Sequence, residues 1–408
     1  MEDTEHSDGK KSISALAYFG GRPVFPTQVH VGRPNIAGQA RFFELAGDIF
    51  NRCWLTNAGP LVQELERRIA GYAGVRHCVA MCNGTIALEV LVRALGLSGE
   101  VIVPSYTFVA SAHALQWLNV TPVFADIDPL THNLDPEQVE RLITKHTTGI
   151  LGVHLWGRGC EVGALEDIAR RHKLRLFFDA AHAFGCSKNG RKIGGFGQAE
   201  VFSFHATKFF NTFEGGAVVT NDDDLAQLAR RMHNFGFAGY DNVVSIGTNG
   251  KMSEIAAAMG LAALDSVPEF IAANRRNYLQ YRAELASVPA IKVLEYDEKE
   301  TNNFQYIVAE IDERLPLSRD SIVAIMHAEN ILCRRYFYPC CHRMEPYRSL
   351  PRYRDVSLPQ SEKVAARVLV LPTGTTLGEE QIGRITGIMR FLVEHADEVA
   401  RAVKQRPG

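Results

Sequence analysis

The chain has 408 residues, of which 46% are hydrophobic and 22% charged, and its formal net charge is −2. This length and composition are typical of a globular protein with two domains. The balanced charge does not favour binding to nucleic acid or to an anionic membrane, and no apolar run is long enough to span a bilayer.

The first predicted elements follow a polar amino terminus. Residues 1–20 begin with "MEDTEHSDGKKS", which is unlike a secretory signal, and we expect them to form a mobile tail. The first clear strand is "HCVAMC", which contains His77, Cys78 and Cys82. Its pattern is that of a buried strand, so we expect no metal site there. None of the eight cysteines forms a C-x-x-C pair, which indicates reduced thiols and a cytoplasmic location.

Strands and helices then alternate along the chain. The helical spacing of Ile86, Leu88, Leu91 and Leu95 predicts a helix directly after the first strand. The next predicted strands are residues 100–104, 121–127, 149–155, 174–180, 200–204 and 216–221, with helices at 107–118 and 161–173. Because these strands are nearly continuous apolar runs, we expect an α/β fold with a mostly parallel sheet covered by helices on both faces.

The pattern changes after about Leu264. The predicted order is a helix at 268–288, a strand at 302–312, a helix at 318–331, a strand within 367–374, and a closing helix from 378 to about 403. This is typical of a smaller α+β domain. The expected division is a flexible tail at 1–20, a large α/β domain at 21–264 and a small carboxyl-terminal domain at 265–408.

Asp179 stands at the end of an apolar strand, where ligands gather in parallel sheets. Its carboxylate could cap a following short helix. It could also pair with a cation, such as the protonated pyridine nitrogen of pyridoxal phosphate.

Lys208 is the single lysine in the apolar, aromatic run "FSFHATKFFNTFEGG". A buried, unpaired ammonium is costly unless the amine is neutralised or used covalently. A desolvated amine readily forms a Schiff base, whereas the alternative is a lysine that extends its charged end into solvent. Since Asp179 lies one crossover unit upstream, both residues can meet at the same sheet edge.

A third group of residues could hold a phosphate. Asn83-Gly84-Thr85 opens a helix after a strand and offers free N–H groups, the positive helix end and the Thr85 hydroxyl. Thr85 could equally cap this helix. Ser203 adds a second hydroxyl near the lysine. A phosphate cup, a partner for the pyridinium and a Schiff-base lysine together indicate a pyridoxal phosphate site.

These stretches resemble the DegT/DnrJ/EryC1/StrS family of pyridoxal phosphate-dependent aminotransferases, which mostly act on nucleotide-linked keto-sugars. The resemblance runs from about Asn35 to the end and is clearest in "FFDAAHAFG", "FSFHATKFFNTFEGGAVVTND" and "NGKMSEIAAAMG". It implies a fold-type I architecture and a homodimer with active sites at the subunit interface. Some relatives have histidine in place of the lysine and remove oxygen from sugars, so Lys208 favours transamination.

The resemblance also implies a role for each matching residue. Lys208 corresponds to the Schiff-base lysine, and Asp179 to the partner of the ring nitrogen. Phe108 corresponds to the aromatic residue stacked on the cofactor ring, and His182, where many members have glutamine, lies beside the ring hydroxyl. The implied phosphate binders are Gly84, Thr85, Ser203 and, from the other subunit, Asn249.

The expected reaction is a ping-pong transamination in which Lys208 acts as base and acid while Asp179 keeps the ring nitrogen protonated. By family analogy, L-glutamate is the donor and a dTDP-4-keto-6-deoxyhexose is aminated at C4, in deoxysugar or antibiotic biosynthesis. Amination at C3, a cyclic keto-polyol, an aminobenzoate-type precursor, and a regulatory or scaffold protein are the alternatives. Candidate substrate contacts are Arg158, Tyr336, Tyr338 and His342, with Lys251, Arg334 and Arg335 as further cations.

Overall fold

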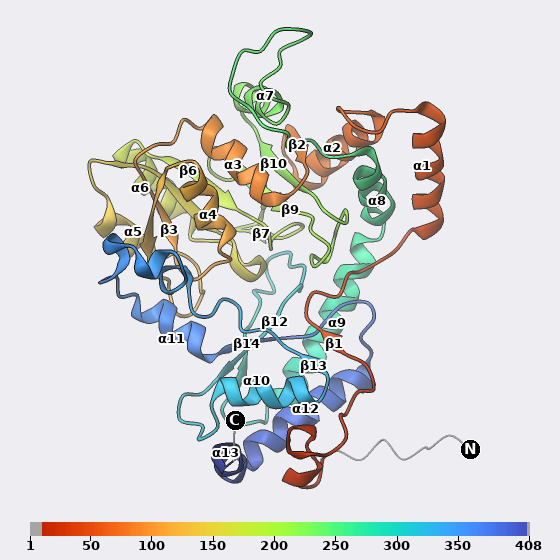
Figure 1. Cartoon of the computed structure of the whole chain (residues 1–408), viewed down its shortest axis with the longest axis vertical. Coiled ribbons are helices and arrows are strands. Elements are labelled where there is room, and N and C mark those ends of the chain that lie inside the picture. Colours follow the sequence, from red (N-terminus) through yellow and green to blue (C-terminus); the bar gives the residue numbers. More distant parts are fainter. Residues whose placement is uncertain (1–9, 406–408) are drawn as a thin grey trace.

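The computed structural model describes residues 10–405. A seven-stranded sheet lies at the centre of its larger part (Figure 1). β10 runs antiparallel to both of its neighbours, and the other pairs in the sheet are parallel. All seven predicted strands are therefore present, and the expected mostly parallel α/β sheet is confirmed. In spatial order they are β2 (His77–Met81), β10 (Gly216–Thr220), β9 (Glu200–Ser203), β6 (Arg175–Asp179), β5 (Thr147–Val153), β3 (Glu100–Pro104) and β4 (Thr121–Ala125).

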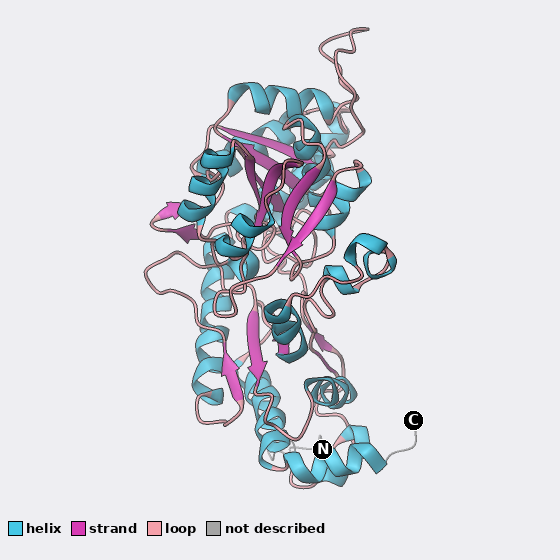
Figure 2. Cartoon of the chain, turned by 90° about the vertical axis from the view of Figure 1, so that its left-hand side faces the viewer, coloured by secondary structure: helices cyan, strands magenta, loops and turns pink. Residues whose placement is uncertain are grey.

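Helices cover both faces of this sheet (Figure 2). Successive strand residues point to opposite faces, so Leu176 and Phe178 pack in one core while Phe177 packs in the other. The first core is closed by α2 (Pro60–Ala73), α5 (Pro136–Leu142), α6 (Val162–His172) and α8 (Glu254–Leu264), with α1 (Gln39–Arg52) lying against α8. The second is closed by α3 (Gly84–Ala94), α4 (Ala110–Trp117) and α7 (Asp223–Met232).

The carboxyl-terminal part forms a smaller α+β layer. Its antiparallel sheet has the order β11 (Ile291–Val293), β12 (Ile307–Ile311) and β14 (Val368–Leu371). The prediction of one continuous closing helix is wrong, because two helices separated at His395 take its place. The helices of this part are α9 (Val267–Leu285), α10 (Arg319–Ala328), α11 (Pro359–Arg367), α12 (Glu379–Glu394) and α13 (Ala396–Gln405).

The amino-terminal segment packs on the small domain, which differs from the predicted division of the chain. Residues 10–20 contain two 3-10 helices, Ile13–Ala15 and Ala17–Phe19, and residues 1–9 lie outside the described part. β1 (Val29–His30) pairs in parallel with β13 (Ile331–Leu332), and Leu16 and Phe25 are buried in the small-domain core. The buried Glu329 carboxylate accepts the backbone N–H groups of Ala17 and Val24, each at 2.7 Å. The segment 10–31 therefore packs on the core of the small domain.

The predicted strand at 302–312 begins later than expected. β12 starts only at Ile307, because the preceding residues bond to the large domain instead of to a neighbouring strand. The amide of Asn303 donates to the carbonyls of His182 (2.9 Å) and Phe184 (3.1 Å). This connection brings the start of the small sheet to the edge of the large one.

A short hairpin joins β7 (Ser187–Lys188) and β8 (Arg191–Lys192). Between residues 10 and 405, no single helix is long and apolar enough to cross a membrane, although the bent pair α8 and α9 passes that test together.

Candidate active site

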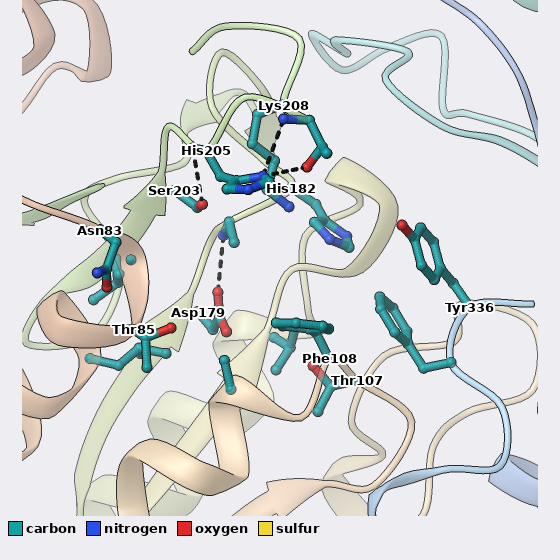
Figure 3. Close-up of a pocket in the computed structure, with 18 of the residues that line it drawn as sticks. Asn83, Thr85, Thr107, Phe108, Asp179, His182, Ser203, His205, Lys208 and Tyr336 are labelled. Atoms are coloured by element: carbon teal, nitrogen blue, oxygen red, sulfur yellow. Dashed lines mark hydrogen bonds between the residues drawn. The ribbon is translucent and has the colours of Figure 1, made fainter. Parts of the chain in front are cut away.

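A cavity of about 600 Å³ lies where the parallel strands end (Figure 3). It receives residues that follow β2, β3, β6 and β9, as expected for ligand sites in open α/β sheets. Asn83 and Thr85 lie on one side of it and Tyr336 on the opposite side, with Asp179 and Phe108 between them (Figure 3). The tertiary structure thus gathers residues from many separate segments.

The amino terminus of α3 forms one corner of the cavity. The Asn83 side chain accepts the N–H of Ile86 at 2.8 Å, which leaves the N–H groups of Gly84 and Thr85 at the open end of the helix. Thr85 is therefore not the cap of this helix; Asn83 is. A Cβ on Gly216 would lie 2.5 Å from the Gly84 nitrogen, so only glycine lets β10 pass this close to the helix end.

Ser203 lies next to this corner because of strand pairing. Gly216 is opposite both Met81 of β2 and Ser203 of β9, so the ends of the three strands are aligned. A Cβ on Gly84 would lie 3.1 Å from that of Ser203. The N–H groups of the helix end and the hydroxyls of Thr85 and Ser203 therefore line one small polar pocket suited to an anion.

Asp179 is buried at the end of β6 and faces the same cavity. Its Oδ1 accepts the N–H of Ala181 at 3.0 Å, and its Oδ2 accepts the Ser111 hydroxyl at 2.7 Å. The sequence left open that Asp179 caps a following short helix, but residues 180–186 form turns, so the bond to Ala181 is a turn contact. It does not use up the carboxylate, which can accept about four hydrogen bonds, so Asp179 can also bind a ligand N–H.

Lys208 reaches the cavity from the loop after β9. Burial lowers the pKa of its amine to about 8, and the nearby Asp179 carboxylate opposes that shift. Its Nζ lies 3.4 Å from the hydroxyl of Tyr306. Since β6 and β9 are neighbours paired through Asp179 and Val201, the predicted meeting of Asp179 and Lys208 at one sheet edge is confirmed.

Phe108 and His182 line the cavity in different ways. The Phe108 side chain is 56% exposed, which is unusual for a phenylalanine, and it leaves an aromatic face open to a ligand. The backbone N–H of Trp156 donates to Nδ1 of His182 at 3.3 Å. Burial, together with the charge of Lys208, lowers the pKa of His182 well below its ordinary value. The neutral ring therefore carries its proton on Nε2.

The predicted substrate contacts separate into two groups. Tyr336 lines the cavity, whereas Arg158, Tyr338 and His342 are absent from its lining. Arg158 donates to the carbonyls of Leu130 (3.2 Å) and Thr131 (3.3 Å). His342 is buried between Ser105 (2.6 Å) and Glu362 (2.9 Å), and the Tyr338 ring packs under the guanidinium groups of Arg319 and Arg335. In this chain these three side chains serve local packing, which the sequence could not show.

The candidate cations separate in the same way. Arg335 pairs with Asp320 at 3.0 Å, and Lys251 donates to Asn57 at 2.6 Å. Arg334 lines the cavity, its guanidinium lies 5.2 Å from the centre of the Tyr336 ring, and no carboxylate within residues 10–405 forms a salt bridge with it. Asn249, expected to serve the other subunit, is likewise outside the lining of its own chain's cavity.

Sequence reasoning missed two groups near the reacting residues. Ser111, fully buried on α4, bonds Asp179 and is in turn 3.1 Å from the Thr107 hydroxyl. Tyr306 precedes β12 and lies beside Lys208. The polar Ser111 within the apolar helix was a signal for the first. Nothing in the sequence around Tyr306 indicates the second.

The cavity fits pyridoxal phosphate at each of its parts. The corner at Gly84, Thr85 and Ser203 suits a phosphate, and the exposed Phe108 ring suits an aromatic plane. The carboxylate of Asp179 suits a protonated ring nitrogen, and the amine of Lys208 suits an aldehyde.

Comparison with known proteins agrees with this description. The DegT/DnrJ/EryC1/StrS aminotransferase family model matches residues 37–390. A dTDP-4-amino-4,6-dideoxy-D-glucose transaminase of Shigella dysenteriae is 37% identical, over 90% of this chain and 99% of that protein. A GDP-perosamine synthase of Caulobacter vibrioides is 35% identical, over 88% and 96%. The crystal structure of DesI in the presence of its TDP-sugar product superposes with a TM-score of 0.93 and 50% identity, over 97% of this chain and all of DesI.

Proposed function

Because the chain belongs to the DegT/DnrJ/EryC1/StrS aminotransferase family, whose enzymes use pyridoxal phosphate, we propose that it aminates C4 of a dTDP-linked 4-keto-6-deoxyhexose. The amino donor in this proposal is L-glutamate. The observation that carries the proposal is the placing of Lys208 and Asp179 in one cavity of a chain that is half identical to DesI. The presence of Lys208 in this cavity favours an enzyme over a regulatory protein.

Each residue has a distinct task in this reaction. The end of α3, Thr85 and Ser203 would hold the phosphate, Phe108 would cover the ring, and Lys208 would be the covalent tether. When bound, pyridoxal phosphate supplies an electron sink for the carbon that loses a proton. The Asp179 carboxylate keeps a proton on the ring nitrogen.

Lys208 then carries the proton of each half-reaction. Its Nζ takes the proton from the α-carbon of the amino acid and later delivers one to C4 of the sugar. An amine with a pKa of about 8 is partly neutral near neutral pH, so it can act as base and as acid without a large penalty. The Nε2–H of His182 would donate to the ring hydroxyl, where many relatives use glutamine.

Arg334 is the cation that we assign to the anionic part of both substrates. It stands at the cavity without a carboxylate partner among the described residues. In a ping-pong cycle the amino acid and the nucleotide sugar occupy the site in turn. One guanidinium can therefore bind the distal carboxylate of glutamate and then the diphosphate of the sugar nucleotide.

We further propose a homodimer with cytoplasmic location. The segment between α7 and α8 projects from the large domain (Figure 1), and Phe235, Phe237, Tyr240, Val244 and Ile246 on it are exposed. So many exposed apolar side chains on one segment favour a protein–protein contact. Asn249 lies three residues after Ile246. The eight free cysteines suit a reducing compartment.

A panel of keto-sugar nucleotides tests the assigned substrate. The purified protein, loaded with pyridoxal phosphate, is given glutamate and a dTDP-4-keto, a dTDP-3-keto or a GDP-4-keto deoxysugar, or a keto-polyol. We expect a C4-amino product, identified by mass and NMR, only with the dTDP-4-keto sugar. Preferred amination of another compound would transfer the assignment to that substrate. Absence of glutamate-dependent amination with all of them would leave the regulatory alternative.

A further inference from the structure

Tyr306 belongs to the small domain by sequence but lies in the active-site cavity. It immediately precedes β12, and its side chain is only 6% exposed. Its hydroxyl oxygen is 3.4 Å from Nζ of Lys208, and it lines the same cavity. The contact joins residues 98 positions apart in sequence.

Contacts from both domains fix the position of Tyr306. Its carbonyl accepts the hydroxyl of Tyr296 at 2.9 Å, and that hydroxyl also lies 3.1 Å from the carbonyl of Trp156. The Tyr306 ring packs against His182, with 4.4 Å between ring centres, and edge-on against Trp156 at 5.2 Å. With its ring held on two sides, the hydroxyl stays directed at the lysine.

A phenol suits the two states of Lys208. Burial raises the pKa of Tyr306 well above its ordinary value, so the hydroxyl stays protonated over the working range of an enzyme. A neutral hydroxyl can accept a hydrogen bond from an ammonium and donate one to a neutral amine. Lys208 has to pass through both states as acid and base, and its four-carbon stem would otherwise leave the free amine mobile.

We propose that Tyr306 is a positioning residue that holds the amine of Lys208 whenever that amine is not bound to the cofactor. This proposal rests on the assignment of Lys208 as the proton carrier. It gives the small domain a direct role in the chemistry, because the residue just before β12 supplies the group that positions the lysine.

The test is Tyr306→Phe, which removes the hydroxyl and keeps the ring packing. The first measurement uses the apoprotein and needs no turnover: pH-dependent acylation of Lys208, followed by mass spectrometry of its peptide. Loss of the acceptor for the ammonium disfavours the charged form, so the pH at which Lys208 becomes reactive should fall. The second measurement is steady-state kinetics, in which kcat should fall about ten- to a hundredfold while the KM for glutamate changes little.

Tyr353→Phe is the matched control. Tyr353 is buried like Tyr306, and its hydroxyl donates to the carbonyl of Pro122 at 2.8 Å, far along the chain from the lysine. The Tyr353→Phe variant should lower the melting temperature about as much as Tyr306→Phe does. It should leave the Lys208 titration and kcat unchanged. If Tyr306→Phe leaves the lysine titration as in the wild type, or changes only KM, the residue merely packs and the proposal is overturned. A failure of the proposed function would look different, because the wild-type protein itself would then show no glutamate-dependent amination, while the titration of Lys208 in the apoproteins would still report on Tyr306.

Discussion

The hydroxyl of Ser111 donates a hydrogen bond of 2.7 Å to Oδ2 of Asp179, and both side chains are buried. The bond joins α4 to the end of β6 and fixes how the carboxylate faces the cavity. Thr107, 3.1 Å from Ser111, extends the contact to the loop after β3. Asp179, which we expect to hold the ring nitrogen, is therefore oriented by α4 and not only by its own strand.

Replacing Ser111 should weaken cofactor binding more than folding. Hydrogen bonds to charged groups contribute about 1.5–3 kcal/mol, so Ser111→Ala should lower pyridoxal phosphate affinity or kcat roughly ten- to a hundredfold. Titration of the apoprotein with the cofactor and steady-state rates measure this. The exposed Ser357 provides the control variant Ser357→Ala, which should behave as the wild type. Equal effects of the two changes would contradict the assigned role.

The lowered pKa of Lys208 predicts a specific pH dependence of stability in the apoprotein. Between its folded value of about 8 and its ordinary value of 10.5, the unfolded chain binds more protons than the folded one. The contribution of Lys208 to stability therefore rises with pH across this window. Below pH 8 the buried ammonium of Lys208 lowers stability by at most about 3 kcal/mol. This is an upper limit because solvent in the cavity screens the charge.

Lys208→Met should accordingly be more stable than the wild type at pH 7, and this advantage should fade by pH 10.5. Urea unfolding of both apoproteins at several pH values measures the difference in their free energies of unfolding. The other titrating groups are the same in both proteins, so their contributions cancel in this difference. Lys299→Met, at an exposed position, should show no such trend. A difference that stays constant with pH would show that the charge of Lys208 is not penalised by burial.

Glu254 stabilises the start of α2 from another helix. Its fully buried carboxylate accepts the N–H groups of Leu61 (3.0 Å) and Val62 (2.9 Å), the free donors of that helix end. Glu254→Gln keeps the shape but loses the charge, and should lower the free energy of unfolding by about 1–2 kcal/mol. Chemical denaturation checks this against Glu269→Gln, an exposed glutamate in the first turn of α9. Similar losses in both variants would exclude a special role.

Arg334 should affect substrate binding rather than the proton transfer. Removal of its charge in Arg334→Ala should raise the KM for both substrates about tenfold, with a smaller change in kcat. Arg334→Lys should recover part of the loss, because lysine keeps the charge without the planar fork. Arg335→Ala is the matched control, since Arg335 is already paired with Asp320. An unchanged KM for Arg334→Ala would remove this residue from the site.

Mixing two inactive variants tests the proposed dimer. If Asn249 serves the partner's site, heterodimers of Asn249→Ala and Lys208→Ala subunits contain one intact site and one doubly altered site. Random exchange at equal concentrations should then recover about a quarter of the wild-type activity. Recovery close to zero would show that Asn249 and Lys208 act within one chain, or that the subunits do not exchange. Size-exclusion chromatography of tagged mixtures separates these two cases.

The sequence predicted the strands of the large sheet well because each is an apolar run whose character depends on its immediate neighbours. It was less accurate where distant contacts override the local pattern. The strand expected at 302–312 starts late because Asn303 bonds the large domain, and the segment 10–31 packs on the small domain through Glu329. Neither partner is near in sequence.

The sequence by itself determined the alternation of strands and helices and the chemical groups at the strand ends, above all Asp179 and Lys208. Parallel strands present their carboxyl ends at one edge, so these groups could meet there, and the pairing of β6 with β9 brings them together. Only the tertiary structure decided which further side chains join them. Arg334 and Tyr306 line the cavity, and the buried Ser111 supports it from behind through its bond to Asp179. Arg158 and His342 are instead engaged in local hydrogen bonds. Such choices depend on contacts between segments far apart in the chain, which local patterns do not encode.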